Sequence, residues 1–244
     1  MSSQIVQIAN AIYQERYCQA AVLFAAGSIV RGEGTAYSDL DLVVIYDSLP
    51  HAYRESFRFE GLPVEAFVHD PGTLRYFFVE MDGRSGVPIL PQMVAEGIEI
   101  PAPNVLSASL KQLAASVLDG GPPRWSDDDL RRRRYEITDQ LDDLRAPRSD
   151  AELWATGTQL YTALADYYLR SRGRWSARGK SIPRVLARAD SAVAVRFDAC
   201  FERLFRSADS SGAIALAEEL LQPDGGLLFE GYRLDAPPEW TRQT

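Results

Sequence analysis

The chain has 244 residues, of which 46% are hydrophobic and 25% are charged, and it carries a formal net charge of -8 with a pI of about 4.9. This composition is that of an ordinary globular protein, and it excludes a disordered or fibrous chain. The acidic balance argues against a protein that binds long nucleic acids mainly through its overall charge, and a small neutral or cationic ligand suits it better.

The N-terminal half carries the pattern of a small mixed sheet with helices. Residues 3–17 place isoleucines at spacings of three and four, which predicts an amphipathic helix. Apolar runs of strand length follow at residues 20–26, 40–46 and 62–68. Residues 57–60 are expected to form a hairpin with the last of these runs. Helices between and beside the strands would complete an α/β (α+β) domain.

Two helices and a proline-broken segment are predicted to follow the sheet. Pro71 opens a helical pattern that is expected to stop at Gly83. Prolines interrupt residues 87–104, and helical spacing resumes over residues 105–118. Turn residues cluster at 119–123, so we predict a domain boundary after residue 120.

The remaining residues predict an all-α helical bundle. Ser126 and the three aspartates after it suit the start of a helix, as a cap and as negative charge near its positive end. Four consecutive arginines, residues 131–134, are interpreted as a solvated helix face with acidic neighbours, in preference to a nucleic-acid patch. Further helices are predicted at residues 151–172, 182–189, 191–207 and 212–221.

Two aspartates stand at the start of the second long strand. The stretch before it, residues 27–41, reads GSIVRGEGTAYSDLD. Because alternate residues of a strand share a face, Asp39 and Asp41 project from the same side and can share a cation. Mg²⁺ usually takes one or two carboxylates and completes its shell with water and phosphate oxygens. The pair therefore predicts a Mg²⁺ site that also binds a triphosphate.

Two further features fit this chemistry. Gly27 and Ser28 stand where a strand gives way to a short helix, so backbone N–H groups and a hydroxyl can face a phosphate. Glu65 lies inside an apolar strand, where a charge is costly unless it is paired or binds metal. Glu65 is expected to complete a site for two Mg²⁺ ions, or to act as the base toward an acceptor hydroxyl.

These residues resemble the DNA polymerase beta-like nucleotidyltransferase superfamily, whose signature is Gly-Ser, a spacer, Asp-x-Asp opening a strand, and a third acid on a later strand. The residues on its signature and flanking positions are Gly27, Ser28, Ser38, Asp39, Asp41 and Leu42. Many members have aspartate as the third acid, whereas this chain has Glu65 in VEAFVHD. The streptomycin/spectinomycin adenylyltransferases are similar in this respect, and in them the glutamate is the base. The resemblance implies a nucleotidyltransferase domain over residues 1–120.

In those adenylyltransferases a C-terminal helical domain closes over the nucleotide and supplies the acceptor pocket. The stretch ADYYLRSRGRWSARGK, residues 165–180, looks like the corresponding helix and loop, which makes Lys180 a candidate phosphate contact. Asp166 and Trp175 are candidate acceptor contacts, because carboxylates and aromatic faces suit a polyhydroxylated and often cationic ligand. The helical bundle domain is accordingly expected to span residues 121–244.

The sequence therefore predicts a Mg²⁺-dependent nucleotidyltransferase that transfers AMP from ATP to a hydroxyl of a small acceptor and releases pyrophosphate. An aminoglycoside-like antibiotic is the leading acceptor, which would make the protein a resistance enzyme. Two alternatives remain open: nucleotidyl transfer to a protein or RNA partner, as in antitoxin-like enzymes, and a nucleotide-binding regulatory protein without turnover. The oligomeric state is not predicted, and neither nucleic acid nor membrane is expected as a partner.

The remaining reactive residues point to no second kind of site. Cys18 and Cys200 are expected to be core thiols, since two cysteines form neither a disulfide framework nor a zinc site. His51 and His69 are expected at the surface or in turns. The N-terminal residues lack the features of a secretion signal, and no apolar stretch is long enough to cross a bilayer, so a cytoplasmic location is predicted.

Overall fold

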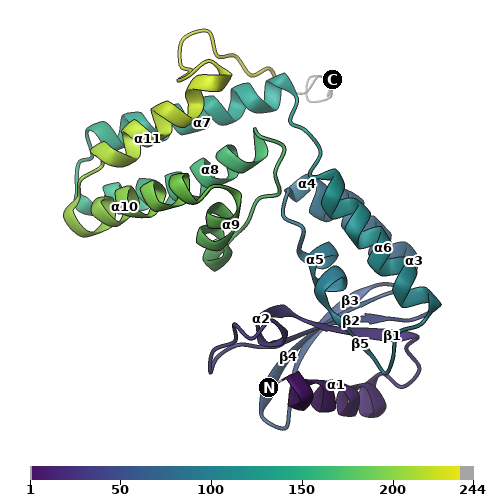
Figure 1. The fold of residues 1–244 in the computed structure, drawn as a ribbon. Coiled ribbons are helices and arrows are strands. Elements are labelled where there is room, and N and C mark those ends of the chain that lie inside the picture. The colour runs from purple at the N-terminus through teal and green to yellow at the C-terminus, as the bar shows by residue number, and fades with distance from the viewer. Residues whose placement is uncertain (1, 237–244) are drawn as a thin grey trace, which may run out of the picture. The chain divides into compact units, whose positions relative to one another are not determined.

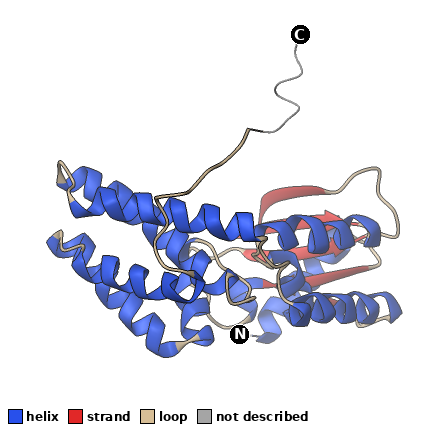
Figure 2. Cartoon of the chain, turned by 90° about the horizontal axis from the view of Figure 1, so that it is seen from above, coloured by secondary structure: helices blue, strands red, loops and turns tan. Residues whose placement is uncertain are grey.

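The computed structural model describes residues 2–236 and divides the chain into two compact units, with the division between Pro123 and Arg124. The first unit contains every strand of the described chain, and the second is built from helices (Figures 1 and 2). The fold is thus a small mixed sheet with helices, followed by a helical bundle, as the sequence predicts. None of the helices among residues 2–236 has the length and apolarity that crossing a membrane requires.

The first unit is organised around a five-stranded sheet in the order β3-β4-β2-β1-β5. Its strands are β1 (Val22–Ala26), β2 (Leu40–Ile45), β3 (Tyr53–Phe59), β4 (Leu62–His69) and β5 (Ile98–Ile100). The central pair β2 and β4 is parallel, and the other neighbours are antiparallel. The two-residue turn at Glu60 and Gly61 joins β3 to β4, and both residues have positive φ, as such a turn requires.

Helices cover both faces of this sheet because apolar side chains project from both faces of its strands. One face packs on α1 (Ser2–Arg16) around Ile12, Leu23 and Leu42. The other face packs around Phe24 and Val43 against four helical elements. These are α3 (Pro71–Tyr76), the π-helix η1 (Phe77–Asp82), α5 (Ile89–Glu96) and α6 (Val105–Gly120). The short helices α2 (Gly27–Val30) and α4 (Gly83–Ser85) complete the unit (Figure 1).

The structure differs from the sequence prediction after the third apolar strand. The helix that opens at Pro71 does not stop at Gly83, because it widens into η1 and continues as α4 up to Gly86, which has φ +71°. The proline-broken segment holds both α5 and β5. Strand β5 has only three residues, and its pairing with β1 extends the sheet at that edge.

Over its described residues, 124–236, the second unit is a bundle of five α-helices. They are α7 (Asp127–Arg145), α8 (Asp150–Arg170), α9 (Ile182–Ala189), α10 (Ser191–Ser207) and α11 (Ser211–Leu221), with the 3-10 turns η2 (Gly179–Ser181) and η3 (Gln222–Asp224). Its core gathers around Leu160, Phe197 and Leu220. Ser126 caps α7 by accepting a hydrogen bond from the Asp129 N–H, as predicted.

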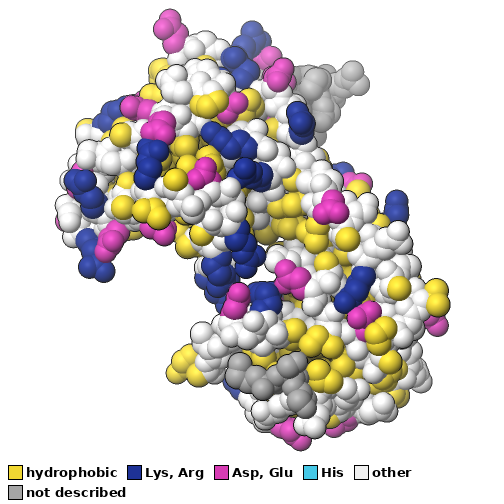
Figure 3. Space-filling model, in the orientation of Figure 1, with side chains coloured by type: hydrophobic (Ala, Val, Ile, Leu, Met, Phe, Trp, Pro, Cys, Tyr) yellow, Lys and Arg dark blue, Asp and Glu magenta, His cyan; other side chains and the backbone are white. Residues whose placement is uncertain are grey.

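Paired charges cover the surface of this bundle. Positive and negative side chains lie beside one another on the face that Figure 3 shows. Within the predicted arginine run, Arg132 pairs with Asp129 at 2.6 Å and Arg133 with Glu136 at 3.1 Å. Arg134 instead donates to the carbonyl oxygen of Gly226 at 2.7 Å. The run therefore serves pairing within the unit.

The two cysteines differ in their surroundings. Cys200 is buried, and burial raises the pKa of its thiol to about 11, so it is an inert core residue. Cys18 is exposed in the loop after α1, so the prediction that both thiols lie in a core is wrong for Cys18.

Candidate active site

Polar side chains line up across one face of the sheet. The register sets Ser56 of β3 opposite Glu65 of β4, and Glu65 opposite Asp41 of β2. Asp41 is in turn opposite Ala26, the last residue of β1. Because opposite residues of neighbouring strands share a face, a polar row crosses three strands and ends beside the turn at Gly27.

Three carboxylates converge in this row. Asp39 lies directly before β2, and one oxygen of each of Asp39, Asp41 and Glu65 lies within 4.8 Å of the other two. All three side chains are partly buried. Carboxylate oxygens are the ligands that Mg²⁺ prefers, and mutual repulsion among three such charges favours the binding of a cation. The donor set therefore fits a divalent metal.

Gly27 lies against the carboxylate of Asp41. A Cβ atom at Gly27 would stand 2.0 Å from Asp41 Oδ2, which no real contact allows, and Gly27 has φ +84°. Only glycine meets both conditions without strain. The turn that follows β1 thus approaches the acids as closely as its backbone permits, and the N–H groups of the short helix α2 begin at this point.

Hydrogen bonds within the loop between α2 and β2 fix the backbone that leads to Asp39. Ser38 is buried, and its Oγ accepts a hydrogen bond from the Thr35 N–H at 2.9 Å. The Ser28 carbonyl accepts one from the Glu33 N–H at 2.8 Å, so the turn after β1 and this loop are tied together. The hydroxyl of Ser38 thus shapes the loop, and its role as a nucleotide contact stays a prediction.

Glu65 has two partners on the edge strand. Arg54 of β3 forms an ion pair with Glu65 Oε1, and Ser56 Oγ lies 3.5 Å from the same oxygen. The Arg54 guanidinium also lies over the ring of Phe67, with Cζ 4.9 Å from the ring centroid. Sequence reasoning missed both partners, because the hairpin prediction began only at Phe57. The alternation of polar and aromatic residues in YRESFRF is the signal that would have found them.

A cavity of about 320 Å³ adjoins the acids on the side of β3. Its lining includes Asp39, Glu65, Ser56 and Arg58. Arg58 donates to the carbonyl oxygen of Gly61 at 2.8 Å and so belongs to the hairpin turn. The Glu65 side chain is thus reachable from this cavity.

His69 ends β4 away from the acids, and Asp70 follows it as the cap of α3. His69 is buried, and its ring packs edge to face with that of Phe77, with the two ring centroids 4.9 Å apart. The prediction of a surface or turn position for His69 is therefore wrong. Burial lowers the pKa of His69, against the smaller opposing effect of Asp70. The pKa of Asp70 is lowered chiefly by the hydrogen bond from the Thr73 N–H, because Asp70 caps α3.

The remaining predicted residues belong to the helical unit. Asp166 is half-buried on α8 one turn before Arg170, Trp175 is half-buried in the following loop, and Lys180 is exposed in η2. Burial lowers the pKa of Arg170, and the charge of Asp166 opposes that shift. Roles for Asp166, Trp175 and Lys180 in ligand binding stay predictions.

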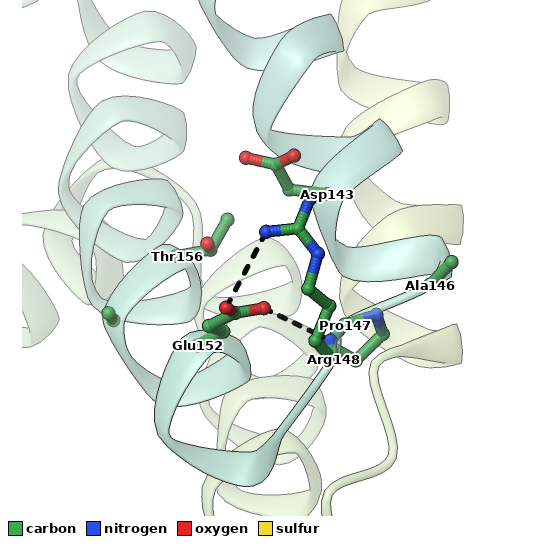
Figure 4. A pocket seen from close by; sticks show the side chains of 7 residues that line it. Asp143, Ala146, Pro147, Arg148, Glu152 and Thr156 are labelled. Carbon is green, nitrogen blue, oxygen red and sulfur yellow. Dashed lines mark hydrogen bonds and ion pairs between the residues drawn. The ribbon is translucent and has the colours of Figure 1, made fainter.

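A cavity of about 260 Å³ in the helical unit lies at the turn between α7 and α8 (Figure 4). Arg148 lies across it, with its guanidinium 3.9 Å from Glu152 and its backbone N–H donating to the same carboxylate at 3.1 Å. The Arg148 side chain is 90% exposed, so this ion pair adds little stability. Asp166, Trp175 and Lys180 are not among the residues that line this cavity.

Comparison with known proteins gives a family match and a likeness to solved structures. Residues 5–72 match the family described as a nucleotidyltransferase domain, and no curated protein matches the chain. A nucleotidyltransferase-like protein from Exiguobacterium sibiricum 255-15 is 18% identical, with a TM-score of 0.44 over 90% of this chain and 75% of that chain. The segment that holds Gly27, Asp39, Asp41 and Glu65 thus matches a nucleotidyltransferase domain.

Proposed function

We propose that this protein is a metal-dependent nucleotidyltransferase that transfers AMP from ATP to a hydroxyl group of a small-molecule acceptor. The observation that carries the proposal is the convergence of Asp39, Asp41 and Glu65 within 4.8 Å beside the close turn at Gly27. The match of residues 5–72 to a nucleotidyltransferase domain supports it.

In this proposal the acids bind the metal, and the turn at Gly27 lies against the phosphates of the nucleotide. Asp39 and Asp41 are the residues that would hold Mg²⁺, with Glu65 as the third oxygen donor. Bound Mg²⁺ would neutralise negative charge on the triphosphate and on the leaving pyrophosphate. Gly27 lets the backbone approach the phosphates, while Ser28 and Ser38 supply hydroxyl groups nearby. Lys180 of the helical domain is the proposed further phosphate contact.

Glu65 acts as the base in this proposal. It accepts the proton of the acceptor hydroxyl as that oxygen bonds to the α-phosphorus of ATP. The bond from the α-phosphorus to the bridging oxygen breaks, and pyrophosphate leaves with the electron pair. The products are the adenylylated acceptor and pyrophosphate, and the proton resides on Glu65 until solvent removes it. Because the chemistry is mainly positioning and charge neutralisation, these few groups suffice.

The acceptor enters beside Glu65 in this proposal. The cavity of about 320 Å³ on the side of β3 offers the space. We further propose that residues 121–244 form the helical domain, with Asp166 and Trp175 as candidate ligand contacts in it. An aminoglycoside-like antibiotic is the proposed acceptor, on the grounds of its hydroxyl groups and of the acidic charge of the chain.

Pyrophosphate release tests the proposal directly. The protein is incubated with Mg²⁺, ATP and each of a panel of aminoglycosides, and α-labelled and γ-labelled ATP are compared. Transfer of the α-label to an antibiotic with release of γ-labelled pyrophosphate is expected. Transfer of the α-label to added protein or RNA would move the acceptor to a macromolecule, and no metal-dependent nucleotide turnover with any acceptor would overturn the proposed activity.

A further inference from the structure

Glu65 shares its site with a cation that the chain itself provides. Arg54 is opposite Phe67 in the β3–β4 register, one row from the Ser56–Glu65 pair, and it reaches diagonally to Glu65 Oε1. The ring of Phe67 lies under the guanidinium at 4.9 Å. An aromatic face and a carboxylate together hold this cation on the β3 side of the three acids.

The exposures of the two partners differ. The Glu65 side chain is 18% exposed, whereas that of Arg54 is 59% exposed. The guanidinium can therefore swing into solvent while the carboxylate keeps its place beside Asp41. Any divalent cation that binds the Glu65 carboxylate must either displace Arg54 or share the carboxylate with it. Sharing is costly, because the two cations repel each other.

The two neighbouring acids lie on the other side of Glu65. Asp39 and Asp41 stand at the start of β2, on the side of Glu65 away from Arg54. The positive charge of Arg54 thus bears most strongly on Glu65, which is the acid proposed as the base.

We propose that Arg54 is a positioning residue that reserves Glu65 for proton transfer by competing with the divalent cation for its carboxylate. The metal is then held chiefly by Asp39 and Asp41. This inference rests on the proposed function, because it concerns the same carboxylates, and it assigns them unequal roles.

Equilibrium binding of Mn²⁺ alone, without nucleotide or acceptor, tests the inference. Arg54→Ala should bind Mn²⁺ about 3- to 10-fold more tightly than the wild type, which is the range expected when a partly exposed ion pair no longer competes. Loss of a merely structural contact would weaken metal binding instead. Arg54→Lys keeps the positive charge but loses the planar contact with Phe67, so it should tighten Mn²⁺ binding less than Arg54→Ala does.

Two matched variants isolate the pair. In a Glu65→Gln background, Arg54→Ala should change the Mn²⁺ affinity by less than about twofold, because the cycle then lacks the carboxylate for which the two cations compete. Arg58 lies on the same face of β3, four residues from Arg54, and it donates to the carbonyl oxygen of Gly61, so Arg58→Ala should also stay within about twofold.

The outcomes separate this inference from the proposed function. If Asp41→Asn binds Mn²⁺ as tightly as the wild type, there is no metal site, and both proposals fall. If Asp41→Asn loses binding while Arg54→Ala leaves it unchanged or weaker, only the role of Arg54 is overturned. A tighter Arg54→Ala whose gain persists in the Glu65→Gln background also overturns it.

Discussion

Replacing Gly27 by alanine should disable the site through one methyl group. The new Cβ would stand 2.0 Å from Asp41 Oδ2 and 2.9 Å from its Cγ, so the carboxylate must move by about 1 Å to reach even a tight contact. A displacement of that size in a catalytic group costs on the order of 100-fold in rate. The backbone conformation at φ +84° adds about 1 to 2 kcal/mol of destabilisation, because alanine is strained there.

Gly32 provides the matched control in the same loop. It has φ +76°, and a Cβ there meets no atom within 4 Å. Gly32→Ala should therefore lose similar stability, about 1 to 2 kcal/mol in urea unfolding, and keep Mn²⁺–ATP binding and pyrophosphate release. Gly27→Ala should lose both activities. Equal activity of Gly27→Ala and Gly32→Ala would refute the close approach of the turn to Asp41.

Three further predictions concern stability, each measured by denaturant unfolding. Burial lowers the pKa of His69 below its ordinary value of 6.5. The stability that the neutral form supports is therefore present above pH 6.5 and is lost as the pH falls toward the lower folded-state pKa. His69→Phe should flatten this pH dependence, and an unchanged slope would contradict the prediction. Asn104→Ala removes the capping box of α6 and should cost about 1 kcal/mol, with an unaltered midpoint as the contrary result. Gly157→Ala puts a Cβ 2.6 Å from Leu204 Cδ2 in the core of the bundle. This crowding should cost about 1 to 3 kcal/mol of stability, despite the better helix propensity of alanine. A higher unfolding midpoint would show instead that Leu204 moves freely.

The sequence predicted those features that local pattern determines. The long strands at Val22 and Leu40 are buried runs between turn residues, and the acids at 39 and 41 share a face because of strand alternation. Helical spacing predicted the ends of the bundle helices to within a few residues, since each helix has a polar cap or a turn at its start. The pairing that brings Glu65 opposite Asp41 requires in addition that β4 lie beside β2, parallel to it and in this register.

Features that depend on distant contacts could not be predicted this way. Strand β5 has three residues between a glycine and a proline, and only its pairing with β1 makes it a strand. His69 is buried because η1 brings Phe77 against it, and a π-helix leaves no clear signature in the sequence. Arg54 lies on a partly exposed edge strand that has no strong apolar run, and its contact with Glu65 depends on the pairing of β3 with β4.

Metal-dependent binding of ATP to the wild type and to Asp41→Asn tests the central claim most directly, because it needs no acceptor. Wild-type binding should require Mn²⁺ or Mg²⁺, and Asp41→Asn should weaken it at least about tenfold, with an unchanged unfolding midpoint. ATP binding that is equally strong in the variant, or indifferent to the metal, would contradict the assignment of these carboxylates to the nucleotide site.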